Sequence, residues 1–482
     1  MERSKTRMQD APHDRLTGSI GVGHIVFFVV AAAAPLTSVV GASPAAFAFG
    51  NGAGVPGTYL VAGLLYLLFS VGFTAMSTRI DSTGGFFQYI TLGLGGRMGA
   101  AGAMVSIATY SAIQLSILAL AGVYLGDVAG PLGLALPWWA WAGAIIGVVM
   151  LVGRRHVELS GNILGVCMLA EIAILLLLDL GCLLHAGPHG IGLDAFAPNI
   201  VLGKGLGVSM VFVIGSFMGF EATALFAEEA RDAKTSIPRA TYLAVGAIMA
   251  FYAFSTWSIT QYYGPDRVTA IAAAGLDTFY FRATEEVLGG WATAVMRALL
   301  ILSLFACALS LHSSINRYLL ALAREGLLSR SLSRVNPAHG APVAAGKVQG
   351  AMAVALVVGA ALLRPDPYAV VFGWASAFAV MGILAVQIVV CIAIVRFFRN
   401  VPDSPSRWVA LVAPTLAGLG LAVCLACVIA NLPLLAGSDS PALHIFPAVL
   451  VLIGLAGAWR AHARRRDRPG RDATLRLLGD ET

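Results

Sequence analysis

The sequence predicts an all-α integral membrane protein with twelve transmembrane helices, two of which are discontinuous. Hydrophobic residues make up 58% of the chain and charged residues only 12%, whereas soluble proteins carry about 25% charged residues. Apolar runs that approach or exceed the roughly 20 residues needed to cross the hydrocarbon recur along the whole chain. The first and the sixth of these runs contain Pro or Gly beside polar residues in their middle. These observations indicate one polytopic membrane domain rather than several soluble domains.

The connections between the apolar runs are mostly short, as in a compact helical bundle. We predict spans at 20–49, 55–78, 98–125, 137–153, 157–186, 205–230, 240–263, 291–323, 343–363, 368–398, 408–431 and 442–461. The predicted division of the chain is a cytoplasmic tail at 1–19, a transmembrane domain at 20–461 and a basic cytoplasmic tail at 462–482.

The placement of Lys and Arg predicts the orientation, because cytoplasmic loops carry an excess of these residues. With the N-terminus inside, the inner segments hold 25 of the 31 basic residues. The outer segments hold only Lys204, Arg267, Arg282 and Arg364. We therefore expect a multi-pass protein of the cytoplasmic membrane with both termini in the cytoplasm. The basic C-terminal tail is expected to contact anionic membrane lipid, and no nucleic-acid-binding module precedes it.

The sixth span contains Gly215, Ser216, Phe217, Gly219 and Glu221 within seven residues. A Gly in a helix interior costs about 1 kcal/mol relative to Ala, and a charged Glu at membrane depth costs several kcal/mol unless it faces protein or water. The glycines alone are also typical of close helix packing. Together with the carboxylate they favour a broken helix whose free N–H and C=O groups line a cavity.

The first span is interrupted by Pro35, Leu36, Thr37 and Ser38. A Pro in a membrane helix is often only a kink, but here two hydroxyl residues follow it. Spans one and six take corresponding positions if the first ten spans form two five-helix repeats, and such paired interruptions indicate a transport site. The predicted substrate-binding residues are Pro35, Leu36, Thr37, Ser38, Gly215, Ser216, Phe217 and Gly219.

Three motifs give the chain a family resemblance. The first is Gly-Phe-Glu at 219–221, followed by Glu-Glu at 228–229 and Ile-Pro-Arg-Ala at 237–240. The second is Ser-Thr-Gly-Gly-Phe-Phe-Gln-Tyr at 82–89, and the third begins with Asn-Arg-Tyr at 316–318 and runs to Gly-Ala-Pro at 340–342. In these motifs and in their order the chain resembles the amino acid–polyamine–organocation (APC) transporter superfamily.

The resemblance implies a five-plus-five inverted repeat with discontinuous helices one and six and two extra helices. It implies a secondary active transporter, not an enzyme, that moves an amino acid or related amine by alternating access. Proton coupling is the favoured expectation, and a sodium-coupled symporter or an exchanger of the same fold is the alternative. Neither a cofactor nor a metal is expected. In this family the amino and carboxylate groups of the substrate bind backbone groups at the two breaks.

The chain departs from the family pattern at two positions that bear on this site. Leu36, Thr37 and Ser38 stand where the family has Gly-Ser/Thr-Gly, which predicts a stiffer and bulkier turn. Glu171 stands in span five where many proton-coupled members have Lys. A carboxyl group among Leu169, Ile172 and other apolar residues loses hydration, and this disfavours its charged form.

Glu171 and Glu221 are the predicted coupling residues. Glu171 can load and release a proton, or it can pair structurally with Arg297 or a nearby hydroxyl group. Glu221 can carry the proton, or it can accept backbone N–H bonds as part of a hinge. Asp179, two turns after Glu171, is a weaker candidate of the same kind.

Phe217 and Trp374 are predicted gating residues above the substrate, although most aromatic residues in membrane helices serve packing. His312 is more consistent with a packed polar residue than with a proton relay. Ser310, Ser313 and Ser314 offer hydroxyl ligands for sodium, but serines in membrane helices usually bond their own backbone. An integral membrane enzyme is the rival class, and the scattered histidines do not show the spacing of a catalytic cluster.

Overall fold

A computed structural model describes residues 20–79, 85–153, 157–186, 190–226, 230–335 and 342–467 of the chain. These residues form helices and turns without any strand, and one isolated parallel bridge joins Ile20 to Ala230. Parts of the family motifs, at 82–84, 228–229 and 336–341, lie outside the described residues, as do both tails apart from residues 462–467.

Each apolar run of the sequence is helical over most of its described length. The long uninterrupted helices are α3 (Val55–Ser77), α5 (Gly96–Ala129), α6 (Trp138–Val152), α7 (Val157–Leu184), α10 (Ala233–Tyr263), α13 (Gly290–Arg324), α14 (Val343–Leu363), α15 (Gly373–Arg399), α16 (Ala413–Ala430) and α18 (Phe446–Asp467). Short segments η8 (Pro367–Phe372), η9 (Trp408–Val412) and η10 (Pro441–Ile445) lead into α15, α16 and α18. The last helix continues to Asp467, past the predicted end of span twelve at 461.

Within the described residues, eight helical segments are long and apolar enough to cross a membrane. They contain α3, α5, α10, α13, α14, α15, α16 and α18. Of the other predicted spans, α6 is apolar but shorter, at 15 residues, and α7 has 28 residues. The remaining two, spans one and six, are each divided. The chain is therefore an all-helical, multi-pass membrane protein.

Both divided spans change helix type along their length. Span one consists of α1 (Val22–Ala33), the π-helical segment η1 (Thr37–Ala42) and α2 (Ser43–Phe49). Span six consists of α9 (Leu206–Val213), followed by the 3-10 segments η5 (Ile214–Phe217) and η6 (Phe220–Phe226). The interruptions predicted from Pro35 and from the glycines of span six are present in the structure.

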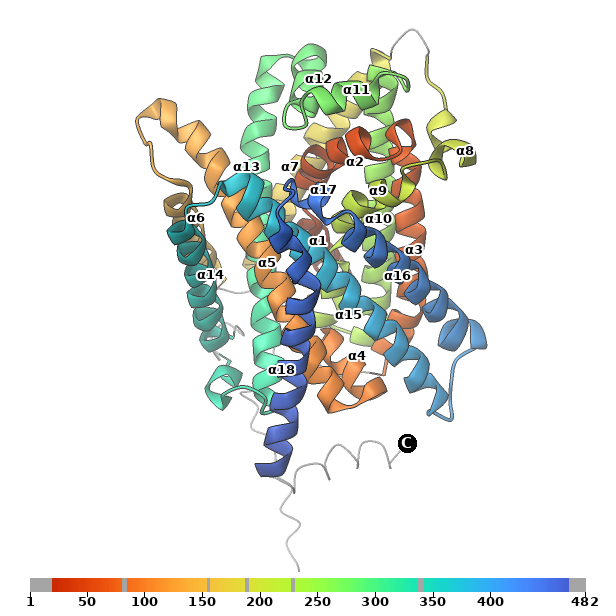
Figure 1. Cartoon of the computed structure of the whole chain (residues 1–482), viewed down its shortest axis with the longest axis vertical. Coiled ribbons are helices and arrows are strands. Elements are labelled where there is room, and N and C mark those ends of the chain that lie inside the picture. The colour runs from red at the N-terminus through yellow and green to blue at the C-terminus, as the bar shows by residue number, and fades with distance from the viewer. Residues whose placement is uncertain are drawn as a thin grey trace, which may run out of the picture.

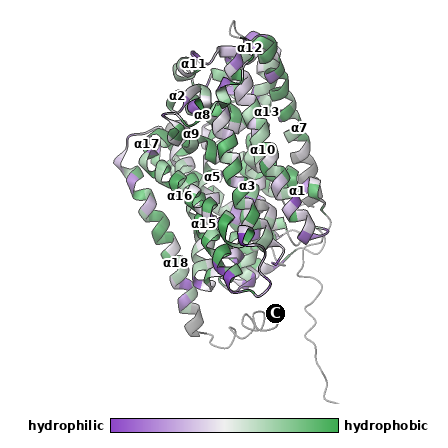
Figure 2. Ribbon diagram, turned by 90° about the vertical axis from the view of Figure 1, so that its right-hand side faces the viewer, coloured by the Kyte–Doolittle hydropathy of each residue, from purple (hydrophilic) through white to green (hydrophobic). Residues whose placement is uncertain are grey.

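Several short helices were not predicted from the sequence. They are α4 (Gly85–Leu94), α8 (Pro198–Val201), α11 (Val268–Ala274), α12 (Phe279–Leu288) and α17 (Leu432–Ala436). Figure 1 shows α11 and α12 at one end of the bundle and α4 near the other end. The body of the bundle between these ends is mostly hydrophobic (Figure 2). Short helices of this kind escape detection because their apolar runs are too short to span a membrane.

The packing of the long helices relates the first five spans to the next five. Helix α3 packs against α10, α5 against α13, and α6 against α14. Helix α7 contacts α1 and α13, while α15 contacts α5 and approaches η5, where a Cβ built at Gly215 would lie 3.3 Å from Val380 Cγ2. Segments η1 and η5 of the two divided spans are also in contact, which brings the two breaks together.

Candidate functional site

The first break lies between Ala33 and Leu36. Ala34 has a φ of +46°, in the left-handed region that side chains other than Gly rarely adopt. Pro35 follows and contributes no N–H donor. The carbonyl oxygen of Ala33, freed by the end of α1, accepts hydrogen bonds from the hydroxyl groups of Ser38 (2.6 Å) and Tyr252 (3.3 Å). The expected exposed carbonyl at this break is therefore already paired with side chains of the protein.

The first N–H donor after this break belongs to Leu36, and it meets the side chain of Glu171. Leu36 N donates to Glu171 Oε2 at 3.3 Å, and Ser303 Oγ donates to the same oxygen at 2.8 Å. Thr37 Oγ1 donates to Ser303 Oγ at 3.5 Å. Glu171 is only 2% exposed. Helices α7 and α13 thus hold a carboxylate at the start of the second half of span one.

This geometry decides between the two structural partners considered for Glu171, Arg297 and a nearby hydroxyl group. The partner is a hydroxyl group, that of Ser303, and not Arg297. The Arg297 guanidinium carbon lies 4.9 Å from the ring centre of Phe281 in α12, where a cation–π contact accounts for its position.

The second break lies at Met218 and Gly219. Met218 N donates to Gly215 O at 3.1 Å, which closes the 3-10 turn, and Gly219 then takes a φ of +108°. Gly219 N donates to Glu221 Oε2 at 3.0 Å, and the Tyr110 hydroxyl of α5 donates to Glu221 Oε1 at 2.6 Å. Both oxygens of Glu221 are therefore in use, one of them by the backbone of the break itself.

Aromatic rings cover the N-terminal side of the second break. The ring of Phe217 is fully buried and stacks on Tyr66 of α3, with ring centres 5.1 Å apart. It also packs against Tyr59 of the same helix at 6.5 Å, and the Tyr59 hydroxyl shares a 3.3 Å hydrogen bond with Ser216 Oγ. The predicted lid residue Phe217 is thus part of an aromatic cluster directly beside the break.

The structure brings most predicted site residues together and places others elsewhere. Trp374, the second predicted gating residue, lies at the start of α15 with its ring edge-to-face against Phe446 of α18, ring centres 6.1 Å apart. Asp179 is 1% exposed and accepts a 2.7 Å hydrogen bond from Ser255 of α10. His312 contacts Gln349 through its Nδ1 atom, so it belongs to a polar contact between α13 and α14.

Several residues at the breaks were not identified from the sequence. They are Tyr59, Tyr66, Tyr110, Tyr252 and Ser303. Tyr59 and Tyr66 are seven residues apart and share a helix face, so polar aromatic residues at helical spacing within an apolar span were an available signal. Ser303 is a single hydroxyl in a leucine-rich run, and nothing in the sequence pairs it with a Glu 132 residues away.

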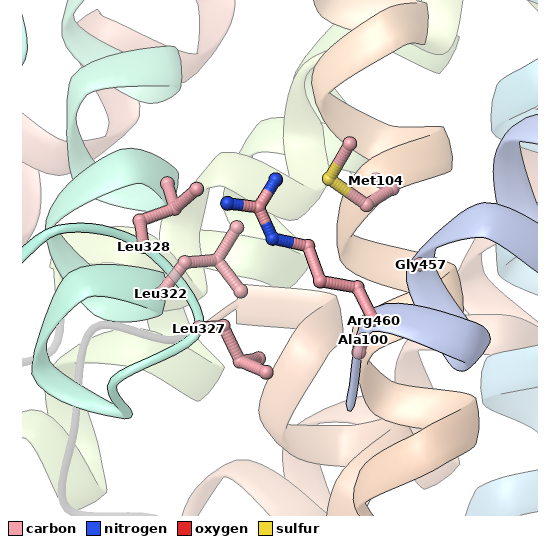
Figure 3. A pocket seen from close by; sticks show the side chains of 7 residues that line it. All are labelled: Ala100, Met104, Leu322, Leu327, Leu328, Gly457 and Arg460. Carbon is pink, nitrogen blue, oxygen red and sulfur yellow. The ribbon is translucent and has the colours of Figure 1, made fainter. Parts of the chain in front are cut away.

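Other features do not add a binding group to the site. Within the described ranges, no three or more His, Cys, Asp or Glu side chains lie close enough to hold a metal ion. A small pocket that contains no residue of either break is lined by residues of α5, the end of α13 with the turn after it, and α18 (Figure 3). There the Arg460 side chain lies among Met104, Leu322 and Leu328, and this apolar lining offers no partner for its charge.

Comparison with known proteins gives a consistent result. A family model described as amino acid permease matches residues 24–458. An uncharacterized transporter, Mb2022c, of Mycobacterium bovis is 26% identical over 321 residues, 65% of this chain and 68% of that protein. The aromatic amino acid transport protein AroP of Salmonella typhimurium is 26% identical over 420 residues, 84% of this chain and 87% of that protein. The branched-chain amino acid permease BcaP of Bacillus subtilis is 22% identical over 400 residues, 78% and 80% of the two chains.

Proposed function

The chain belongs to the amino acid permease family, and from this premise we propose that it is a proton-coupled secondary transporter. It moves an amino acid or related amine across the cytoplasmic membrane by alternating access. The observation that carries the proposal is the pair of adjacent breaks, each with a buried carboxylate bonded to a backbone N–H. Paired discontinuous helices of this kind form substrate sites in transporters.

The proposed substrate site lies between the two breaks. It is formed by Pro35, Leu36, Thr37 and Ser38 on one side and by Gly215, Ser216, Phe217 and Gly219 on the other. Thr37 and Gly215 retain partial exposure while their neighbours in the breaks are buried. Phe217 is the proposed gate on the aromatic side, and Trp374 is a second proposed gate at the start of span ten. AroP and BcaP are named for aromatic and branched-chain amino acids, so we propose an apolar L-amino acid as the first substrate to test.

The proposed architecture has twelve spans, with the first ten in two inverted repeats. The helix contacts support this arrangement because the neighbours of span five correspond to those of span ten. Span five (α7) packs on spans one and eight, while span ten (α15) packs on span three and approaches span six at Gly215. Exchanging the two repeats maps span five onto span ten, span one onto span six, and span eight onto span three. The neighbours of span five therefore correspond to the neighbours of span ten. Spans eleven and twelve, α16 and α18, are the two extra helices.

The proposed orientation has both termini in the cytoplasm. Two contacts join the connection between spans two and three to two other segments of the chain. The Arg79 guanidinium donates to Asp403 O at 2.9 Å, and Arg97 Nη2 lies 2.5 Å from His462 Nδ1. These residues connect three segments that the charge pattern assigns to the inner side. Single-cysteine variants near residues 3 and 474 should resist an impermeant thiol reagent in intact cells, and labelling at either position would overturn the orientation.

The proposed coupling residue is Glu171, and Glu221 is the second candidate. A buried carboxylate at the substrate site can take up a proton from one side and release it to the other as the site opens alternately. The test measures uptake of L-leucine and L-phenylalanine into proteoliposomes under an imposed inward proton gradient or sodium gradient. We expect the proton gradient to accelerate uptake by wild type and not by Glu171→Gln.

The controls distinguish the parts of this proposal. Asp179→Asn neutralises a second buried carboxylate on the same helix and should keep the gradient response. If uptake responds to the sodium gradient and not to the proton gradient, the coupling ion is sodium and not the proton. Failure of wild type to transport any amino acid or amine of a broad panel would contradict the proposed function itself.

A further inference from the structure

Glu171 occupies the position at which a substrate carboxylate is expected to bind. Leu36 N is the first donor after the break, because Pro35 has no N–H, and Ser38 N is already bonded to Ala34 O at 2.8 Å. A continuous helical segment, Thr37–Phe49, starts there. The N-terminal end of such a half-helix carries partial positive charge that suits an anion. The anion present in the structure is the protein's own Glu171, at 3.3 Å from Leu36 N.

The hydrogen bonds at Glu171 allow it to give up the Leu36 N–H to a substrate carboxylate. Oε2 accepts two hydrogen bonds, one from Leu36 N and one from Ser303 Oγ. Among the described residues no donor reaches Oε1. Glu221 differs, since its two oxygens bind Gly219 N and the Tyr110 hydroxyl separately. If Glu171 releases Leu36 N, its Oε2 keeps the hydrogen bond from Ser303, whereas Glu221 Oε2 would lose the donor that it has when Gly219 N is released.

Two ionised carboxylates cannot share the Leu36 donor at low cost. Like charges a few ångströms apart in a poorly hydrated site repel strongly. A protonated Glu171 is neutral, and its O–H group becomes a donor that can itself bond to a carboxylate. A substrate that carries a carboxylate therefore competes with ionised Glu171, while the protonated form favours its binding.

The other titratable groups near Glu171 do not supply this switch. Helix α10 contributes Tyr252 and helix α13 contributes Cys307, and both act electrostatically with Glu171. Neither a tyrosine nor a cysteine carries charge near neutral pH in an apolar setting. Helix α1 holds His24 in its first turn, nine residues before Ala33, and the Tyr280 hydroxyl of α12 shares a 2.9 Å hydrogen bond with Ser43 Oγ. Asp179 is the remaining acidic group on α7 and serves below as the control.

We propose that Glu171 is a built-in competitor for the substrate carboxylate, so that an α-amino acid binds Leu36 N only when Glu171 is protonated. This inference rests on the proposed function and specifies its substrate class as zwitterionic α-amino acids, as opposed to amines without a carboxylate. It also gives symport a physical basis, because the proton and the amino acid must be present together. An amine without a carboxylate has no such requirement and can bind ionised Glu171.

The test compares matched ligands that differ only in the carboxylate. Binding of L-leucine and L-phenylalanine, and of their decarboxylated amines isopentylamine and phenethylamine, is measured on purified full-length protein at a pH of about 5.5 and at a pH of about 8. We expect the Kd of the amino acids to be at least about tenfold lower at the acidic pH, since linkage to one proton allows up to about tenfold per pH unit. The amines should show no gain at the acidic pH.

Three variants make the test specific. In Glu171→Gln the Kd of the amino acids should change by less than about twofold between the two pH values, because the linked proton is absent. Asp179→Asn should retain the wild-type pH dependence. Ser303→Ala removes one of the two donors that stabilise ionised Glu171, so amino acid binding at the higher pH should become tighter.

The outcomes separate this inference from the proposed function. Amino acid transport with a Kd that does not depend on pH, or a pH dependence that persists in Glu171→Gln, would overturn the competitor role and leave the transporter assignment intact. Equal pH responses of the amino acids and the amines would also overturn it. Absence of uptake of every amino acid and amine by wild type would overturn both.

Discussion

At both breaks a backbone N–H that has lost its helical partner bonds to a carboxylate, but the two carboxylates come from different parts of the chain. At the second break Gly219 takes a φ of +108° and its N–H bonds to Glu221, two residues further along the chain. At the first break a non-glycine residue, Ala34, takes a φ of +46°, and the N–H of Leu36 bonds to Glu171, 135 residues away. The backbone N–H at the second break thus finds its partner locally, whereas the N–H at the first break depends on α7 packing against it.

This difference makes the second break fixed, meaning that its carboxylate keeps its backbone partner. The first break is exchangeable, meaning that its carboxylate can give up its backbone partner to a ligand. Glu221 uses one oxygen for the backbone and the other for Tyr110, so neither is available without losing a buried hydrogen bond. Glu171 uses a single oxygen for both of its partners. If alternating access moves the half-helices, the first break is where the contacts can change most readily.

The largest expected effect is that of Gly219→Leu. The variant places a bulky side chain at the proposed substrate site, and the left-handed φ adds backbone strain of about 1–3 kcal/mol. We expect uptake to fall by at least about tenfold, which corresponds to about 1.4 kcal/mol in the activation free energy of transport. We also expect a lower unfolding temperature, because the backbone strain destabilises the folded state. Proteoliposome uptake and thermal unfolding measure the two effects. Normal uptake would show that this break does not face the substrate.

The isosteric pair Glu221→Gln and Glu171→Gln tests the fixed and exchangeable roles through stability. In Glu221→Gln the amide oxygen can keep Gly219 N, but the –NH2 group then faces the Tyr110 hydroxyl, which must turn from donor to acceptor. The 2.6 Å charge-assisted bond is replaced by a weaker neutral one, at a cost of about 1 kcal/mol. In Glu171→Gln the amide oxygen replaces Oε2 and the –NH2 group takes the unused position. We expect thermal unfolding in detergent to detect destabilisation only in Glu221→Gln. Equal destabilisation of both variants would remove the distinction between the breaks.

Gly215→Ala probes the contact between the second break and span ten. The added Cβ would lie 3.3 Å from Val380 Cγ2, so α15 must shift by a few tenths of an ångström. Because an overpacked site also costs stability, about 1 kcal/mol is expected here, together with a several-fold slower uptake. The matched control is Gly246→Ala on α10, where a Cβ meets nothing within 4 Å. If the two variants transport equally fast, the approach of span ten does not limit the site.

The smallest expected effect is that of Ala34→Gly at the first break. Gly adopts a positive φ without the penalty of a Cβ, so relief of strain opposes the greater entropy of Gly in the unfolded chain. We expect a change in the free energy of unfolding of less than about 1 kcal/mol, in the stabilising direction. Ala33→Gly, in the last helical position of α1, should destabilise by about 1 kcal/mol. Destabilisation by Ala34→Gly equal to that of Ala33→Gly would contradict the left-handed conformation at Ala34.

The sequence alone determined the class of the protein and the location of both breaks. Composition and the length of the apolar runs predict membrane helices because the bilayer sets the length of a span. Pro35 and Gly219 predict interruptions because they act on the backbone of their own segment, through a missing N–H or a permitted positive φ. The carboxylate that meets the second break, Glu221, belongs to the same local segment, since its backbone partner Gly219 lies two residues away.

Only the tertiary structure decided which groups meet the breaks. Ser303 and Glu171 are 132 residues apart, and Tyr252 reaches the Ala33 carbonyl across 219 residues. The sequence suggested that broken helices leave their polar groups free, but packing pairs the Ala33 carbonyl with two hydroxyl groups and the Leu36 N–H with a carboxylate. The physical reason is that buried polar groups must find hydrogen-bond partners, while the partner chosen depends on which helices pack together and not on any local pattern of residues.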